Sequence, residues 1–91
     1  MYSLVWTESF LRTARKFFKK HPDLKPAFED VVRKLQQNPD TPSLKFHQLK
    51  GIHKGKSSVS LTYSYRINIT IKVTGKEIFL LDIGSHDEVY R

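Results

Sequence analysis

The chain has 91 residues, which suits one domain, and we expect a single domain over residues 1–91. Sixteen Lys and Arg residues against nine Asp and Glu residues give a formal charge of +7, so we expect a polyanion or an acidic protein as partner. The chain has no cysteine, which excludes disulfides, thiolate metal sites and cysteine nucleophiles.

The N-terminal part predicts a short strand and a helix. Residues 2–6 are β-branched and aromatic, as is typical of a strand. Thr7 is suited to cap the following helix, and Pro22 predicts that this helix ends near Lys20 or His21. Its apolar positions recur with helical spacing at Phe10, Leu11, Ala14, Phe17 and Phe18.

A second helix is expected after Pro22, capped by Asp23 and with Pro26 in its first turn. Asn38-Pro39 predicts its end. Its apolar stripe consists of Leu24, Phe28, Val31, Val32 and Leu35. Because the connection is short, the two helices should form an antiparallel hairpin.

From Val59 to Val73 the pattern changes to a period of two, with apolar or aromatic residues at every odd position. One strand of this length is unusual, so we expect a break near Tyr63-Ser64. Thr74-Gly75 signals a turn, and residues 78–81 are apolar on both faces, which predicts a central strand. The expected fold is α+β: an N-terminal strand, a two-helix antiparallel hairpin and a three-stranded antiparallel meander in one mainly antiparallel sheet.

The N-terminus lacks a basic segment before a long apolar run, so we expect no signal peptide. No apolar stretch approaches the roughly 20 residues that cross a bilayer. We therefore expect a cytoplasmic protein without a membrane partner.

Residues 47–56 contain two His, three Lys and two Gly residues. A basic loop with glycines lets backbone and ammonium groups approach phosphates, although a solvated flexible loop has the same composition. Arg66 starts the polar face of the strand that follows Tyr63 and Tyr65. The alternative role for Arg66 is a surface ion pair with Asp82 or Glu77.

The C-terminal residues 82–91 are polar and ionisable, and they follow directly on a strand that is expected to be buried. Gly84 permits a turn that would bring His86 back over the sheet. An imidazole, with an unperturbed pKa of about 6.5, suits proton transfer near neutral pH. Tyr90 is suited to stack on a nucleobase. The alternatives are an idle exposed His86 and a Tyr90 that only packs the tail against the sheet.

Three motifs together resemble the RelE/ParE toxins, and within them the RelE- and YafQ-like branch. The motifs are His47-x-Leu49-x-Gly51, Tyr63-x-Tyr65-Arg66-Ile67 and Ile83-Gly84-Ser85-His86-Asp87-Glu88-Val89-Tyr90. The resemblance implies the toxin of a type II toxin–antitoxin system, a metal-independent endoribonuclease without cofactor. Such a toxin cleaves mRNA in the ribosomal A site by attack of a ribose 2′-hydroxyl on the adjacent phosphate.

The resemblance also implies roles for single residues. His86 matches the C-terminal histidine of the YafQ-like toxins and would be the general acid, and Tyr90 matches their terminal aromatic residue. His47 matches an active-site histidine before the Leu-x-Gly loop, and Arg66 matches the strand arginine that would stabilise phosphate charge. The expected RNA-contacting residues are Lys50, Lys54, Lys56 and Tyr65.

The chain departs from the YafQ-like pattern at one point. Those toxins carry a further histidine on the second strand and an Asp-aromatic pair after it, where this chain has Ser60 and Ser64-Tyr65. The second proton-transfer partner is therefore missing. His47 or His53 could replace it, or the rate could rest mainly on electrostatics.

Two other functions fit the resemblance: a ParE-like toxin that inhibits DNA gyrase without nuclease activity, and a catalytically degenerate module that binds antitoxin or RNA. The pair of His86 and Tyr90 favours the nuclease, because gyrase inhibition needs no proton transfer. All of these functions imply a cognate antitoxin whose acidic side chains would cover the basic face. DNA binding would belong to the antitoxin, not to this chain alone.

Overall fold

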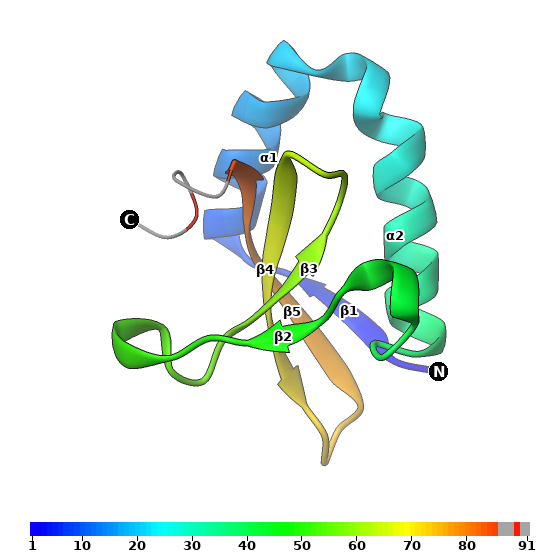
Figure 1. The fold of residues 1–91 in the computed structure, drawn as a ribbon, viewed down its shortest axis with the longest axis vertical. Helices are drawn as coiled ribbons and strands as arrows, with labels where there is room; N and C mark the ends of the chain where they lie inside the picture. The colour runs from blue at the N-terminus through cyan, green and yellow to red at the C-terminus, as the bar shows by residue number, and fades with distance from the viewer. Residues whose placement is uncertain (86–88, 90–91) are drawn as a thin grey trace.

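The computed structural model describes residues 1–85 and residue 89, and within them two helices lie against a five-stranded sheet (Figure 1). The elements are β1 (Ser3–Trp6), α1 (Glu8–Lys20), α2 (Lys25–Gln37), β2 (His47–Gln48), β3 (Ser57–Ser60), β4 (Tyr65–Lys72) and β5 (Glu77–Ser85). Short 3₁₀ turns are η1 (Pro22–Leu24), η2 (Pro42–Leu44) and η3 (Gly51–His53). No helix in these described ranges is long and apolar enough to cross a bilayer.

The strands lie in the order β1-β5-β4-β3-β2. Strands β3, β4 and β5 form the expected antiparallel meander, and β5 is an inner strand, as its apolar sequence predicts. Two details of the layout differ from the expectation. Strand β1 pairs with β5 in parallel, and residues 47–48 form an additional edge strand, β2, antiparallel to β3. A strand of two residues is too short to show a period of two, so the sequence pattern could not reveal it.

Thr7 caps α1 as predicted, because its Oγ1 accepts a hydrogen bond of 3.1 Å from the Phe10 N–H. The same hydroxyl donates to the Leu80 carbonyl of β5 at 2.6 Å. Further along α1, Thr13 Oγ1 accepts from the Ile83 N–H at 3.3 Å. Strand β1 pairs with β5 only as far as Leu80. Beyond Leu80, a side chain of α1, Thr13, accepts a hydrogen bond from the β5 backbone. These bonds join the helix to the strand that leads to the C-terminal segment.

The helical hairpin is present, with ends at Lys20 and Gln37 as the two prolines predict. The chain turns between the helices at the top of the view in Figure 1. The expected cap of α2 by Asp23 is wrong. Pro22 starts the turn η1, which takes Asp23 into its own first turn, and α2 begins at Lys25 without a side-chain cap.

The strand register places odd-numbered residues of β3 and β4 in the core. Val59 pairs with Ile67, and the break after β3 falls at residues 61–64, as expected. The pairs Asn68–Asp82 and Ile69–Leu80 leave Leu81 as an extra residue in β5, a β-bulge. The bulge moves Asp82 to the face of the sheet that Asn68 occupies. The fully buried core residues are Phe10, Leu35, Leu44, Val59, Ile67, Ile69, Ile78 and Leu80.

Candidate active site

A row of polar residues crosses the sheet on the face opposite the buried odd-numbered residues of β3 and β4. Strands β2 to β5 each contribute one member: His47 pairs with Ser58, Ser58 with Asn68, and Asn68 with Asp82. Directly paired residues of neighbouring strands point to the same face. We call His47, Ser58, Asn68 and Asp82 the polar row. Arg66 belongs to the same face, because it lies two residues before Asn68 on β4.

Arg66 is held by the polar row. Its Nε donates to Ser58 Oγ at 2.9 Å, and its Nη2 lies 3.4 Å from His47 Nδ1. The ion pair with Asp82 or Glu77 is not formed: within residues 1–85 and 89, ion pairs join only Asp30 to Arg33 and Lys34. A half-exposed guanidinium with a fixed plane and no carboxylate partner is suited to bind a phosphate through two parallel hydrogen bonds.

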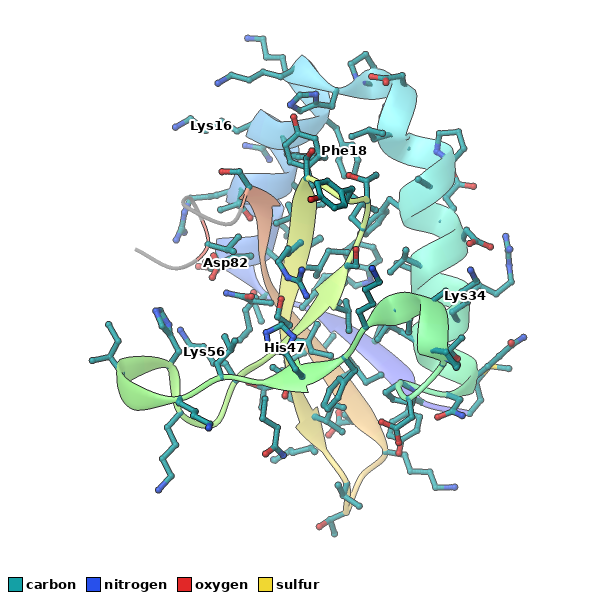
Figure 2. The ribbon with its side chains drawn as sticks, viewed as in Figure 1. Lys16, Phe18, Lys34, His47, Lys56 and Asp82 are labelled. Atoms are coloured by element: carbon teal, nitrogen blue, oxygen red, sulfur yellow. The ribbon has the colours of Figure 1, made fainter. Side chains whose placement is uncertain are left out.

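His47 is exposed on the edge strand, and its Nδ1 lies 3.4 Å from the Lys45 carbonyl as well as 3.4 Å from Arg66 Nη2. The two contacts require opposite tautomers. The carbonyl oxygen only accepts, so it needs a proton on Nδ1, whereas the guanidinium only donates, so it needs the Nδ1 lone pair. When Nδ1–H faces Lys45, the Nε2 lone pair points away and is available to accept a proton. Figure 2 shows His47 on β2 in front of the sheet.

The loop lysines lie at a different place from Arg66. Lys50, Lys54 and Lys56 line a cavity of about 680 Å³, and neither His47 nor Arg66 is among its lining residues. Ile71 and Val73, on the odd-numbered face of the β4 hairpin, do line it. The three lysines of the loop between β2 and β3 therefore lie outside the Arg66 site, at a cavity that residues of the opposite face also line.

The shape of this loop depends on its glycines. Gly51 and Gly55 have φ values of +67° and +92°, a region that favours glycine. The Thr70 hydroxyl donates to the Gly55 carbonyl at 3.3 Å, which attaches the loop to β4. The turn expected at Thr74-Gly75 is present between β4 and β5, and its positive φ falls on Lys76 (50°).

Tyr65 lies on the face opposite Arg66. Its ring packs against Phe17 at 5.0 Å and His21 at 4.8 Å, measured between ring centroids. Consecutive residues of a strand point to opposite faces, so closeness in sequence to Arg66 does not bring the two side chains together. Tyr65 lines a second cavity, of about 450 Å³, together with Lys16 and Lys20. Its RNA contact remains a prediction, and this placement does not favour it.

His86 and Tyr90, the expected general acid and stacking residue, lie outside the described residues. Val89 is described: it is buried, and its carbonyl accepts a hydrogen bond of 3.0 Å from Asn68 Nδ2. The C-terminal segment thus reaches the polar row at Val89. In the sequence, Asn68 belongs to the alternating polar face of the strand that Arg66 starts. The signal that sets it apart is an amide between two core isoleucines, Ile67 and Ile69.

No family model and no curated protein matches the chain. Solved structures do. A metal-bound toxin from Helicobacter pylori superposes with a TM-score of 0.82 at 28% identity, over 99% of this chain and 100% of that one. The YoeB/ParE toxin from Agrobacterium tumefaciens gives 0.76 at 22% identity, over 92% and 98%. The E. coli DinJ-YafQ toxin-antitoxin complex gives 0.78 at 16% identity, over 99% and 98%.

The chain has the RelE/ParE toxin fold.

The resemblance expected from the three motifs is thereby confirmed at the level of the fold. The structural neighbours of this RelE/ParE-like chain include toxins of type II toxin–antitoxin systems. The Helicobacter pylori toxin is metal-bound in that structure. In this chain, residues 1–85 and 89 contain no group of three or more His, Asp or Glu side chains that could hold a metal ion.

Proposed function

We propose that this chain is the toxin of a type II toxin–antitoxin pair and that it cleaves mRNA on the ribosome. The observation that carries the proposal is that Arg66 and His47 lie side by side on the polar face, with Nη2 3.4 Å from the ring, and that Ser58 holds the guanidinium. A cation and an imidazole that meet on an accessible face are the groups that phosphodiester cleavage requires.

The proposed reaction is an internal transfer of the phosphate. The ribose 2′-hydroxyl loses its proton to a base, and its oxygen attacks the adjacent phosphorus. The bond from phosphorus to the 5′-oxygen breaks, and that oxygen takes a proton from an acid. The products carry a 2′,3′-cyclic phosphate and a 5′-hydroxyl, and no redox change or external nucleophile is needed.

Arg66 would stabilise the negative charge that gathers on the phosphorane oxygens. Pre-organised donors are effective there because they need no rearrangement during the reaction, and removal of one such donor typically slows a reaction about 10²–10³-fold. The bond from Nε to Ser58 Oγ supplies that pre-organisation. The Nη2 of Arg66 lies 3.4 Å from His47 Nδ1, next to the proposed base.

His47 would accept the 2′-hydroxyl proton through Nε2 while Nδ1–H faces the Lys45 carbonyl. This assignment supplies the second proton-transfer group that the sequence comparison lacked. His86 would protonate the leaving 5′-oxygen, and Tyr90 would stack on a base beside the cleaved bond. Lys50, Lys54 and Lys56 would contact the RNA backbone next to the reacting phosphate.

We further propose a cognate antitoxin as protein partner. The chain carries a formal charge of +7, and the described ion pairs use only Arg33 and Lys34 among its cations. An acidic antitoxin segment would compete with RNA for the remaining cations. The complex of DinJ with YafQ is the corresponding assembly of a structural neighbour.

Induction of the chain in a bacterial host, followed by primer extension on a reporter mRNA, tests the nuclease proposal. We expect cuts within translated codons, and none when the start codon is removed so that ribosomes do not engage. His86→Ala should abolish the growth inhibition and strongly reduce the cuts, to a residual rate that single-turnover kinetics can measure, while its melting curve stays cooperative. Intact mRNA together with DNA breaks would instead identify a gyrase inhibitor. Intact mRNA and normal growth would identify a degenerate binding module.

The dependence on the ribosome is tested with purified components. A programmed mRNA on 70S ribosomes should be cut. The cutting should continue when EDTA is added to remove transition metals, provided that enough Mg²⁺ is present to keep the ribosomes intact. The same mRNA without ribosomes should remain uncut. Cutting of free RNA at the same rate would contradict the ribosome requirement.

A further inference from the structure

Asn68 is a fully buried amide in the middle of β4, between the equally buried Ile67 and Ile69. Its Nδ2 donates to the Val89 carbonyl at 3.0 Å, a contact between residues 21 positions apart. Since a carbonyl oxygen only accepts, this contact also fixes which end of the amide carries the NH₂ group. The bond joins the centre of the sheet to the C-terminal segment.

The two neighbours of Asn68 in the polar row have other partners. Ser58 Oγ accepts from Arg66 Nε at 2.9 Å, and Asp82 Oδ1 accepts from Ser9 Oγ at 2.9 Å. Within the described part of the chain, the Asn68 amide therefore has the Val89 carbonyl as its hydrogen-bond partner. The side chain is directed at the C-terminal segment and not along the row.

Asn68 is a poor choice for stability alone. Its Oδ1 is buried and has no hydrogen-bond partner among residues 1–85 and 89. A buried acceptor without a partner destabilises a fold, whereas a leucine of similar size would fill the same space without that penalty. The feature that only the amide provides at this position is the bond to Val89.

We infer that Asn68 is a positioning residue that anchors the C-terminal segment on the polar face beside Arg66. This inference rests on the proposed function, because the anchored segment carries His86 and Tyr90. Arg66 and Asn68 lie two residues apart on one face of β4, which separates their Cα atoms by about 6–7 Å. One strand thus holds both the phosphate-binding cation and the anchor of the segment that bears the general acid.

The anchor is tested by Asn68→Leu, with Gln36→Leu as the matched control. Gln36 also donates a side-chain amide to a backbone carbonyl, that of Tyr2 at 3.5 Å, but from α2 and to the N-terminal strand segment. We would measure ¹⁵N relaxation of the Val89 amide in the full chain. We expect an order parameter near about 0.85 in the parent and in Gln36→Leu, and below about 0.6 in Asn68→Leu.

Single-turnover cleavage on programmed ribosomes tests the positioning role. We expect Asn68→Leu to lower the rate up to about 100-fold, the scale of loss when a catalytic group is displaced by about 1 Å. In a His86→Ala background the same substitution should cause no further loss, because the group that it positions is already absent. A general loss of folded protein would instead lower the rate in both backgrounds.

A rigid Val89 amide in a cooperatively folding Asn68→Leu variant would overturn the anchor. Equal fold-losses in the parent and His86→Ala backgrounds would overturn the positioning role. If the leucine variant does not unfold cooperatively, Asn68→Ala removes the amide without added bulk and the same criteria apply. The relaxation measurement needs no RNA. A mobile Val89 in Asn68→Leu, combined with intact mRNA after induction of the parent chain, would therefore keep the anchor and end the nuclease proposal.

Discussion

Ser58 and Arg66 lie on neighbouring antiparallel strands, and the Arg66 Nε donates to the fully buried Ser58 hydroxyl at 2.9 Å. This bond fixes the guanidinium plane before any RNA binds. Arg66 therefore loses little conformational entropy when it binds a phosphate, which is the advantage of a pre-organised site.

Arg66→Lys should lower the cleavage rate almost as much as Arg66→Ala. An ammonium keeps the charge but cannot bond Ser58 and a phosphate in one plane. We expect a loss of about 10²–10³-fold for Arg66→Ala, and a smaller loss for Ser58→Ala, which frees the guanidinium without removing it. Single-turnover rates on programmed ribosomes give the three values. A lysine variant with the parent rate would show that charge alone suffices.

The loop lysines should contribute to binding and not to the chemical step. Each contact with a single-stranded RNA phosphate is expected to add about 0.7 to the slope of log affinity against log salt. We therefore expect Lys50→Ala, Lys54→Ala and Lys56→Ala each to reduce that slope and to leave the rate at saturating RNA unchanged. Fluorescence anisotropy with a labelled oligoribonucleotide at several salt concentrations measures the slope. Lys34→Ala on α2, whose ammonium already pairs with Asp30 at 2.9 Å, is the control.

Thr7→Ala should destabilise the fold, because one hydroxyl serves both the first turn of α1 and the Leu80 carbonyl of β5. We expect a loss of about 1–2 kcal/mol, the upper part of the range for an N-cap threonine. Thr7→Ser keeps the hydroxyl and should be close to the parent. Urea unfolding followed by circular dichroism gives the free energies of unfolding. Equal stability of the alanine and serine variants would contradict the double role of this hydroxyl.

Tyr65→Ala should lower stability more than it lowers RNA affinity, since the ring packs on Phe17 and His21. We expect a loss of about 2 kcal/mol from the missing ring contacts and the space left behind. Tyr65→Phe retains the ring and should behave as the parent in thermal unfolding. An unchanged melting temperature together with weakened RNA binding in Tyr65→Ala would place Tyr65 among the RNA-contacting residues.

Much of the fold could be predicted from short stretches of sequence. The helix ends at Lys20 and Gln37 follow from Pro22 and from Asn38-Pro39, and the inner position of β5 follows from its apolar residues. The prediction that Asp23 caps α2 is wrong, because Asp23 lies inside the 3₁₀ turn η1, which begins at Pro22. A proline followed by an aspartate suits the start of such a turn as well as the start of a helix. Local preferences differ by too little to decide between two such turns.

The site was less accessible to prediction. His47 and Arg66 were each singled out, but their contact across 19 positions of sequence depends on an edge strand of two residues that shows no period. Tyr65 was expected to contact RNA, and its ring packs on the face opposite Arg66. Asn68 was overlooked, because its partner Val89 lies in a segment whose return to the sheet no local pattern indicates.

The sequence by itself determined where α1 begins, where both helices end and which residues of β3 and β4 face the core, because caps, prolines and periodicity act within a few residues. Only the tertiary structure decided which polar residues meet. The pairing of β2 with β3, and the bulge at Leu81 that moves Asp82 to the face of Asn68, depend on contacts between distant segments. A shift of one residue in either register would turn a member of the polar row to the opposite face.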